Sequence, residues 1–298
     1  MNKIYQYKSR EERNMATHNQ VRIKGYILNE VKIIGDTENQ TEKAFINVRT
    51  THRDIDNFKG ERFEDILVYY DGSDERMMDK IKKLNPFDII DIKGVFNILT
   101  MNKRSHCPSC GNANVKYNGS ATFIYPIDIE KCNALMTAYE HDEELPEKLL
   151  VKHYKETSNQ ALIIGTVVND PKLKQYKNTV CCQYMLGVDR KYYIKTQGEI
   201  TADYPWVYTF GRQAEDDARH LIKGSVILVD GFIRTRKVGV PMVCENCGAE
   251  YEYPDLATEF IPYSIEYLNN YLTDEDIAKI EEEQRQTEYE NAKKEIWG

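Results

Sequence analysis

The sequence predicts an all-β protein built from two tandem five-stranded barrels, each with a short helix between its third and fourth strands, followed by a C-terminal helix. Two observations lead to this prediction. The chain of 298 residues repeats itself at an offset of about 140 residues. Each repeat also holds five short runs rich in β-branched and aromatic residues, with one helical segment after the third. We therefore expect two copies of one fold.

Matching segments in the two halves carry the repeat. They pair residues 19–29 with 159–169, 93–96 with 230–233, 107–111 with 244–248, and Ala121, Thr122 and Pro126 with Ala257, Thr258 and Pro262. The offset drifts by only a few residues from the first pair to the last, as expected of repeated structural units.

The predicted elements follow the same order in both repeats. The expected strands are 21–28, 44–50, 63–70, 89–92 continuing as 95–99, and 122–127 in the first repeat, and 161–168, 180–188, 206–210, 226–233 and 259–265 in the second. Helical periodicity predicts helices over 74–84 and 214–221. This is the strand order of an oligonucleotide-binding (OB) fold. We expect an arm at 1–18, the first OB-fold at 19–133, an acidic linker at 134–158, the second OB-fold at 159–271, and an acidic C-terminal helix or tail at 272–298.

The net charge of −8 is concentrated in two segments. Residues 272–298 hold nine acidic and four basic residues, and the linker holds six acidic and three basic ones. The rest of the chain is therefore neutral as a whole, and basic clusters can lie on one face of it. The total charge does not exclude a nucleic-acid partner.

The N-terminus has no apolar core of the kind found in a signal peptide, and no apolar run approaches the length of a membrane span. Seven cysteines, an odd number, include two Cys-x-x-Cys pairs rather than a disulfide framework. We expect a cytoplasmic protein. The sequence has no phosphate-binding glycine loop with its lysine and no spaced histidine–carboxylate pair, so we expect no enzyme activity.

Aromatic rings alternate along the third strand of the second repeat, at Tyr204, Trp206, Tyr208 and Phe210. A period of two places all four on one face of a strand. Either that face packs in the core, or its rings stack on the bases of a single strand while nearby cations meet the phosphates. The cations nearest in sequence are Arg212, Arg234, Arg236 and Lys237, with Phe232 among them.

This part of the chain resembles the bacterial single-stranded DNA-binding protein (SSB) family. The motifs that carry the resemblance are Phe210-Gly211-Arg212, Ala214-Glu215, Lys223-Gly224 and the run from Gly231 to Lys237 that reads Gly-Phe-Ile-Arg-Thr-Arg-Lys. The resemblance implies that Tyr204 replaces a base-stacking tryptophan and that Phe210 is a stacking phenylalanine. It also implies an acidic tail that recruits partners, although this chain ends Glu295-Ile296-Trp297-Gly298 and lacks the family's tip sequence.

Basic residues recur after the second strand and in the hairpin of each repeat, which favours phosphate contact. The candidates in the first repeat are Arg49, Arg53, Lys103 and Arg104. In the second repeat they are Arg190, Lys191, Tyr192 and Tyr193, in addition to the basic hairpin residues named above. The first repeat aligns Glu64, Ile66, Val68 and Tyr70 with the four rings of the second, so only Tyr70 is expected to stack on a base. DNA binding is therefore expected mainly in the second barrel.

The two Cys-x-x-Cys-Gly turns contain Cys107 and Cys110 in the first repeat, and Cys244 and Cys247 in the second. A tetrahedral zinc needs two such turns, and each repeat supplies one. One Zn²⁺ per chain, shared by the two repeats, is the expected arrangement. A site shared between two chains, and a set of cysteines that bind no metal or form a redox pair, are the alternatives. Cys132, Cys181 and Cys182 are expected to be packed thiols.

The leading hypothesis is a single-stranded DNA-binding protein that acts in replication, repair, or plasmid or phage DNA transfer. The alternatives are a zinc-clamped OB-fold scaffold for protein partners and an accessory subunit of a nucleic-acid machine; RNA is not excluded as a ligand. In the resembled family four barrels act together, which implies a homodimer of this two-barrel chain, against a monomer that lines up with its neighbours along DNA. The acidic C-terminal helix is a further candidate for binding protein partners.

Overall fold

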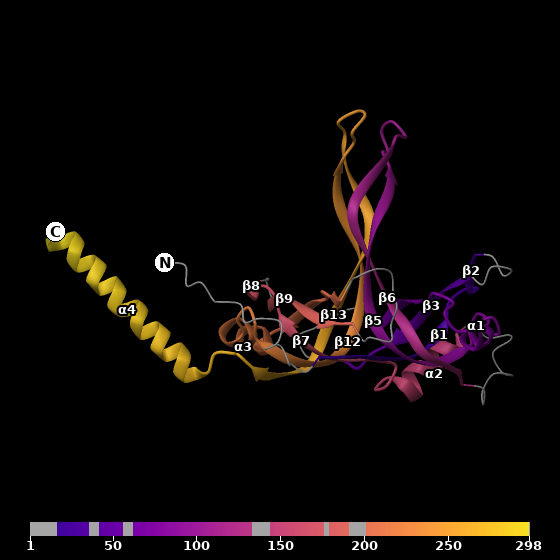
Figure 1. The fold of residues 1–298 in the computed structure, drawn as a ribbon, viewed down its shortest axis with the longest axis horizontal. Helices are drawn as coiled ribbons and strands as arrows, with labels where there is room; N and C mark the ends of the chain where they lie inside the picture. Colours follow the sequence, from indigo (N-terminus) through magenta and orange to yellow (C-terminus); the bar gives the residue numbers. More distant parts are fainter. Residues whose placement is uncertain are drawn as a thin grey trace.

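The computed structural model describes residues 17–35, 42–55, 62–132, 144–175, 179–190 and 201–297, and it is an all-β fold, as predicted (Figure 1). Its first half contains β1 (His18–Ile27), β2 (Lys32–Ile34), β3 (Lys43–Thr51), β4 (Phe63–Tyr70), α1 (Glu75–Ile81), β5 (Ile89–His106) and β6 (Ala113–Lys131). Its second half contains β7 (Asn159–Val167), β8 (Lys172–Gln175), β9 (Val180–Asp189), β10 (Ala202–Asp203), β11 (Trp206–Phe210), α3 (Arg212–His220), β12 (Val226–Val243) and β13 (Glu250–Asn269).

Each half closes into a ring of five strands. In the first ring β1 pairs with both β3 and β5, β3 pairs with β4, β5 with β6, and the parallel contact of β4 with β6 completes the circle. The second ring repeats these pairings with β7, β9, β11, β12 and β13. Gly25 permits the close approach of β1 to β3, because a Cβ there would lie 2.4 Å from the Arg49 carbonyl oxygen.

Alternating apolar residues fill the two rings. Val21, Ile23 and Ile27 of β1 are buried, and Val207 of β11 is buried in the same way in the second ring. The helix after the third strand packs on the core of each ring, α1 through Met78 and Ile81 and α3 through Ala214 and Asp217. The sequence patterns therefore mark the core-facing residues of both copies.

The two rings join through their first strands, which run antiparallel from the pair His18 and Ile164 to the pair Ile23 and Asn159. Two equivalent asparagines lie on these strands and make the same contacts inside each ring. Asn19 bonds both the N–H and the carbonyl of Phe96, and Asn159 does the same at Ile233, with all four distances between 2.8 and 3.0 Å. The antiparallel pairing of equivalent strands relates the two rings by an approximate two-fold axis.

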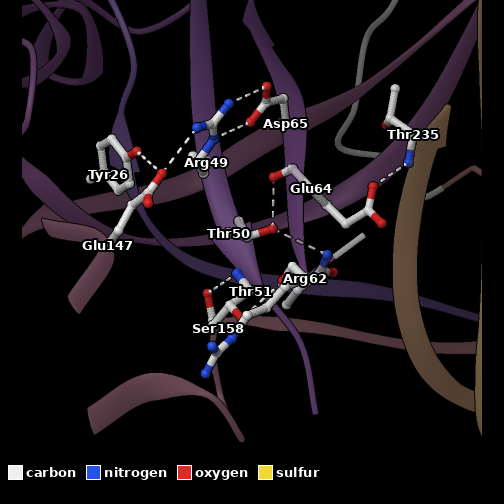
Figure 2. A network of polar contacts seen from close by, with 11 residues as sticks. Tyr26, Arg49, Thr50, Thr51, Arg62, Glu64, Asp65, Glu147, Ser158 and Thr235 are labelled. Carbon is white, nitrogen blue, oxygen red and sulfur yellow. Dashed lines mark hydrogen bonds and ion pairs between the residues drawn. The ribbon is translucent and has the colours of Figure 1, made fainter. Parts of the chain in front are cut away.

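Two buried carboxylates cross the junction in the same reciprocal way. Glu64 in the first ring accepts the N–H of Thr235 in the second at 2.8 Å, as Figure 2 shows, and Asp203 in the second ring accepts the N–H of Ile98 in the first at 2.8 Å. Glu64 is 2% exposed and Asp203 is 1% exposed. We call this pair the carboxylate latches.

The hairpins β5–β6 and β12–β13 are much longer than the sequence predicts, and they rise side by side from the rings (Figure 1). The expected strands ended at Leu99 and Ile233, whereas the observed strands continue to His106 and Val243. The inner face of the first hairpin carries Lys103 and Ser105, which have no apolar alternation to reveal a strand.

The linker and the C-terminus form helices. In the described part of the predicted linker, α2 (Leu145–Leu149) continues as the π-helical turn η3 (Leu150–Tyr154), and Leu150 is fully buried against Tyr26 and Ile89. The helix expected near 133–139 and almost all of the predicted arm lie outside the described residues. Thr273 and Asp276 cap α4 (Asp274–Trp297) by exchanging hydrogen bonds. No described helix is long and apolar enough to span a membrane.

Candidate nucleic-acid interface and metal centre

The four aromatic rings around β11 lie on its outward face. Val207 and Thr209 point into the core and are at most 2% exposed, so the alternate residues Trp206, Tyr208 and Phe210 point away from it. These three rings are half-buried, and Tyr204, just before the strand, is 52% exposed. The strand therefore presents a row of aromatic rings on the surface of the second five-stranded ring.

A glycine makes room at one end of this row. Gly187 of β9 lies beside Tyr204, and the Cε1 atom of Tyr204 would be 3.6 Å from a Cβ at Gly187. Because Gly187 has no side chain, nothing projects from the outer face of β9 at this point, next to the most exposed ring of the row. This arrangement leaves one side of the Tyr204 ring accessible.

The basic residues beside the row fall into two groups. Arg212 at the start of α3 has a side chain that is 92% exposed, and Lys237 on β12 is also exposed. Arg234 and Arg236 instead bind the carboxylate of Glu259, which is 2% exposed and lies opposite Trp206 in the parallel pairing of β11 with β13. We call these three residues the Arg–Glu cluster; its net charge is one positive unit.

One aromatic ring, that of Tyr208, lies beside the Arg–Glu cluster. Burial raises the pKa of the Tyr208 hydroxyl. The charge of Glu259 raises this pKa further, whereas the neighbouring Arg236 lowers it. The Arg236 side chain remains 44% exposed while Glu259 holds its guanidinium in place. A phosphate that reaches this face would meet a cation that is already oriented.

Two of the predicted DNA-binding residues lie at the junction between the two five-stranded rings. Phe232 has no exposed surface, and its ring stacks on His52 of the first ring with centroids 3.9 Å apart. Arg190 has a side chain that is 4% exposed, binds Asp203, and donates to the Ile98 carbonyl at 2.7 Å. These contacts join the two halves, so neither side chain is available to a ligand in this structure. Lys191, Tyr192 and Tyr193 lie outside the described residues.

The first ring places other residues on the corresponding face. Val68 pairs with Ile124 as Val207 pairs with Phe260, so the two third strands align one residue away from the predicted alignment. Asp65, Leu67 and Tyr69 are therefore the equivalents of Tyr204, Trp206 and Tyr208. The predicted ring Tyr70 instead points inward, is 3% exposed, and bonds the N–H of Asp74 at the start of α1.

The linker helix covers part of this face in the first ring. Arg49 forms a bidentate ion pair with Asp65, the residue opposite it on β4, and its third bond goes to Glu147 of α2, which also accepts from the Tyr26 hydroxyl (Figure 2). Arg49 is thus shared by two carboxylates. At the corresponding place the second ring has Gly187 and Tyr204.

The remaining predicted bases of the first ring differ in their surroundings. Arg53 stacks over the ring of Tyr263, with its guanidinium carbon 3.7 Å from the ring centroid. Lys103 is 12% exposed and pairs with Asp255 of the other hairpin, whereas Arg104 is exposed. Only Arg104 of these three points freely away from the junction of the two halves.

The four cysteines of the two Cys-x-x-Cys-Gly turns meet at the tips of the two hairpins. The Sγ atoms of Cys107 and Cys247 lie 3.7 Å apart, those of Cys110 and Cys244 lie 3.6 Å apart, and all four fall within 4.8 Å of one another. Both turns have the same form, with the glycine at a φ of 71° donating its N–H to the carbonyl of the first cysteine at 2.9 Å.

These distances suit a tetrahedral metal. Zinc–sulfur bonds of about 2.3 Å place neighbouring sulfurs about 3.8 Å apart in a tetrahedron. The N–H groups of Cys247 and Asn246 point at the Cys244 sulfur and lower its pKa to about 6, and turn N–H groups also lower the pKa of Cys107 against the effect of burial. Against the Ala249 N–H, which lowers it, contacts with Cys110 and Cys244 raise the pKa of Cys247 to about 12. The cluster thus favours a thiolate at Cys244 before any cation arrives, and the donor set fits Zn²⁺.

The other three cysteines are packed in the two halves, as expected. Burial raises the pKa of Cys181 to about 11 and that of Cys182 to about 12, which keeps both thiols neutral. Burial also raises the pKa of Cys132. None of the three belongs to the group of cysteines at the hairpin tips.

Comparison with known proteins places the chain among proteins of one kind. The model of the single-strand binding protein family matches residues 158–241, which include the row of rings and the Arg–Glu cluster except Glu259. Single-stranded DNA-binding protein 1 of Staphylococcus aureus is 30% identical over 141 residues, which cover 45% of this chain and 84% of that protein. The chain belongs to the single-strand binding protein family.

Other relatives of this SSB-family chain agree. Single-stranded DNA-binding protein 2 of Clostridium acetobutylicum is 38% identical over 80 residues, which cover 26% of this chain and 59% of that protein. The crystal structure of the wild-type single-stranded DNA binding protein from Thermus aquaticus is 14% identical and has a TM-score of 0.57 over 87% of this chain and 97% of that one. Its fold thus extends over both halves of the present chain. Membership in this family of binding proteins agrees with the prediction of a protein without enzyme activity.

Proposed function

We propose that this SSB-family protein binds single-stranded DNA without sequence preference, and that it coats and protects the strand in replication, repair, or plasmid or phage DNA transfer. The observation that carries the proposal is the row of outward rings at Tyr204, Trp206, Tyr208 and Phe210, flanked by exposed bases. Aromatic faces stack on any base, and cations at their side follow the phosphates, so such a surface is indifferent to sequence. The relatives named as single-stranded DNA-binding proteins support it.

The second ring carries most of the binding in this proposal. Its face offers four rings, the exposed cations Arg212 and Lys237, and the oriented Arg236. The same face of the first ring has Asp65 and Arg49, whose charges cancel each other and which lie against Glu147. An incoming strand would therefore gain less by stacking there and would approach two carboxylates. We retain Arg53 as a phosphate contact at the edge of the surface, whereas Arg104 lies on the outer face of the projecting hairpin.

The two hairpins are held together by one Zn²⁺ per chain, with Cys107, Cys110, Cys244 and Cys247 as its ligands. The donor set and the sulfur–sulfur distances support this assignment. Each turn brings two ligands, so loss of any one cysteine opens the site to the same degree whichever repeat it comes from. The metal would hold the tips of the hairpins in register and would take no part in contact with the DNA bases.

We further propose that two chains associate into a homodimer with four rings. The short outer strands support it, because β2 and β8 occupy equivalent edges of the two rings and expose Ile33, Ile34 and Leu173. Light scattering of the DNA-free protein should give about twice the 34.8 kDa of one chain; a mass near that of one chain would contradict this part of the proposal. The exposed end of α4, with Ile296 and Trp297, is the proposed place for protein partners.

The proposed function is tested by comparing the affinity of the protein for oligo(dT), a duplex of the same length, and the matching RNA. We expect tight binding to oligo(dT) and to mixed-sequence single strands, and binding to the duplex that is weaker by on the order of a hundredfold, because paired bases do not expose their faces to the rings. Equal affinity for duplex and single strand would contradict the proposal. A preference for the RNA would replace DNA by RNA as the ligand.

A further inference from the structure

The outer parts of the two hairpins, residues 99–121 and 236–257, pack face to face and form one projecting unit, which we call the stalk (Figure 1). Ser105 and Asn114 of the first hairpin both bond the Tyr251 hydroxyl of the second, at 2.7 and 3.0 Å, and Lys103 pairs with Asp255. Residues 103, 105, 251 and 255 therefore line the inner faces of the two hairpins. Side chains at the alternate positions point outward, on opposite sides of the stalk.

Charge is divided between the two hairpins. From residue 101 to residue 127 the first hairpin has the basic residues Lys103, Arg104 and Lys116 and no acidic residue. From residue 236 to residue 257 the second has the acidic residues Glu245, Glu250, Glu252 and Asp255, and its two basic residues, Arg236 and Lys237, lie together at its base. Equivalent segments of the two repeats thus carry opposite charge, which the repeat itself does not require.

Most of this charge remains unused within the chain. The pair of Lys103 and Asp255 lies inside the stalk, but Arg104 and His106 point outward on the first hairpin, and Glu250 and Glu252 point outward on the second. Among the described residues neither Arg104 nor these two glutamates takes part in an ion pair. The two outer faces look in opposite directions, so they are unable to meet within one molecule.

We propose that the outer faces of the stalk join neighbouring copies of this chain, the basic face that carries Arg104 of one chain against the acidic face of Glu250 and Glu252 of the next. Exposed Val243 and Leu256 and the prolines Pro241 and Pro254 lie on the acidic face, which adds apolar contact and removes N–H groups from a nearby strand edge. Charge complementarity selects the partner, because the matching surface is present on every other copy.

A contact of this kind joins two different surfaces, so it repeats in one direction instead of closing into a pair. Chains bound side by side on a single strand would each offer one face to the next, and each bound chain would favour the binding of its neighbour. This consequence rests on the proposed DNA binding, whereas the contact itself does not.

The test uses two full-length variants. Glu250→Lys with Glu252→Lys makes both outer faces basic, and Arg104→Glu with His106→Glu makes both acidic. We expect each variant alone to lose the association beyond the proposed dimer, at concentrations where the wild type shows it in sedimentation without DNA. An equimolar mixture of the two should associate again, because unlike faces then alternate. Glu288→Lys with Glu290→Lys on α4 is the matched control for charge and should behave as the wild type.

DNA provides the second readout. On an oligo(dT) that holds two chains, the ratio of doubly to singly bound molecules should fall about three- to tenfold for Glu250→Lys with Glu252→Lys and should recover when all four substitutions are combined in one chain. Failure of the mixture to associate, or a ratio equal to that of the control, would overturn the stalk contact. Absence of any binding to oligo(dT) in a wild type that still self-associates would overturn the proposed function and leave the stalk contact standing.

Discussion

At the scale of single residues, the surface of the second five-stranded ring carries aromatic rings that are partly packed, and it also carries cations of two kinds. Trp206, Tyr208 and Phe210 are half-buried, so each keeps one part of its ring in contact with the protein and offers the rest. Arg234 and Arg236 are held by the buried Glu259, while Lys237 and Arg212 are not held in this way. The held arginines supply position and the exposed cations supply net charge.

Lys237 allows the electrostatic part of this description to be tested. Replacing it with alanine should reduce the slope of log affinity against log salt by about 0.7, the value for one phosphate contact with a single strand. Measuring oligo(dT) affinity across a salt series gives this slope. Lys83→Ala at an exposed position after α1 is the control, and its slope should match that of the wild type. An unchanged slope for Lys237→Ala would remove this residue from the interface.

The sequence allowed much of this residue-level description to be predicted, and its failures have physical causes. Alternation along residues 204–210 correctly placed four rings on one face. The burial of Phe232 against His52 depends on a contact between halves of the chain about 180 residues apart in sequence, which no local pattern reveals. Tyr70 was misplaced because the two third strands differ by one residue in alignment, and a one-residue shift moves a side chain to the opposite face of a strand.

At the scale of elements, the two rings meet through contacts that come in equivalent pairs. The carboxylate latches illustrate the pattern, since Glu64 bonds Thr235 and Asp203 bonds Ile98 from the other side. The pairs are not equal, however. Asp203 also binds the buried guanidinium of Arg190 with bonds of 2.8 and 2.6 Å. It should therefore contribute more to the stability of the junction.

Alanine substitutions measure this difference. Glu64→Ala leaves the Thr235 N–H without its partner and should lower the free energy of unfolding by about 1–3 kcal/mol. Asp203→Ala strands a buried cation as well and should cost about 3–5 kcal/mol. Asp65→Ala breaks only a partly exposed ion pair and serves as the control, at about 0–1 kcal/mol. Urea titrations of the three variants give these values, and equal costs for Glu64→Ala and Asp65→Ala would contradict the role of the latch.

Of the features at this scale, the length of the hairpin strands is the one that the sequence predicts least well. In the second repeat Val238, Val240 and Met242 alternate opposite Tyr251 and Tyr253, a signal that would support longer strands. In the first repeat the inward positions are Lys103, Ser105 and Asn114, so the strand is formed by polar contacts with the other hairpin. A strand stabilised in this way has no hydrophobic period of its own.

At the scale of the whole molecule, the chain behaves as two copies of one fold that have taken different tasks. The first copy binds the linker helix over Arg49 and supplies a basic hairpin, and the second exposes the rings and supplies an acidic hairpin. The four cysteines form a set of side chains that both copies keep in the same form. The proposed metal thus connects the two copies at the point farthest from their shared first strands.

Metal content and its dependence on pH test this connection. We expect one zinc per chain by elemental analysis, and the same loss of metal from Cys107→Ser as from Cys244→Ser. The affinity of the protein for zinc should fall as the pH falls, because protons compete for the thiolates. It should fall steeply below about pH 6, where even Cys244 becomes protonated. Two metals per chain, or an affinity independent of pH between 5 and 8, would contradict a shared four-thiolate site; Cys132→Ser should leave the metal in place.

The two tryptophans of the chain, Trp206 in the row of rings and Trp297 at the exposed end of α4, permit the most direct test of the binding surface. Stacking of a base on an indole quenches its fluorescence, so oligo(dT) should quench Trp297→Phe, in which only Trp206 emits. The same titration of Trp206→Phe, in which only Trp297 emits, should leave the fluorescence nearly unchanged although the DNA still binds. Binding of oligo(dT) to Trp297→Phe without quenching, measured in parallel by the anisotropy of a labelled strand, would contradict the claim that the outer face of β11 holds the DNA.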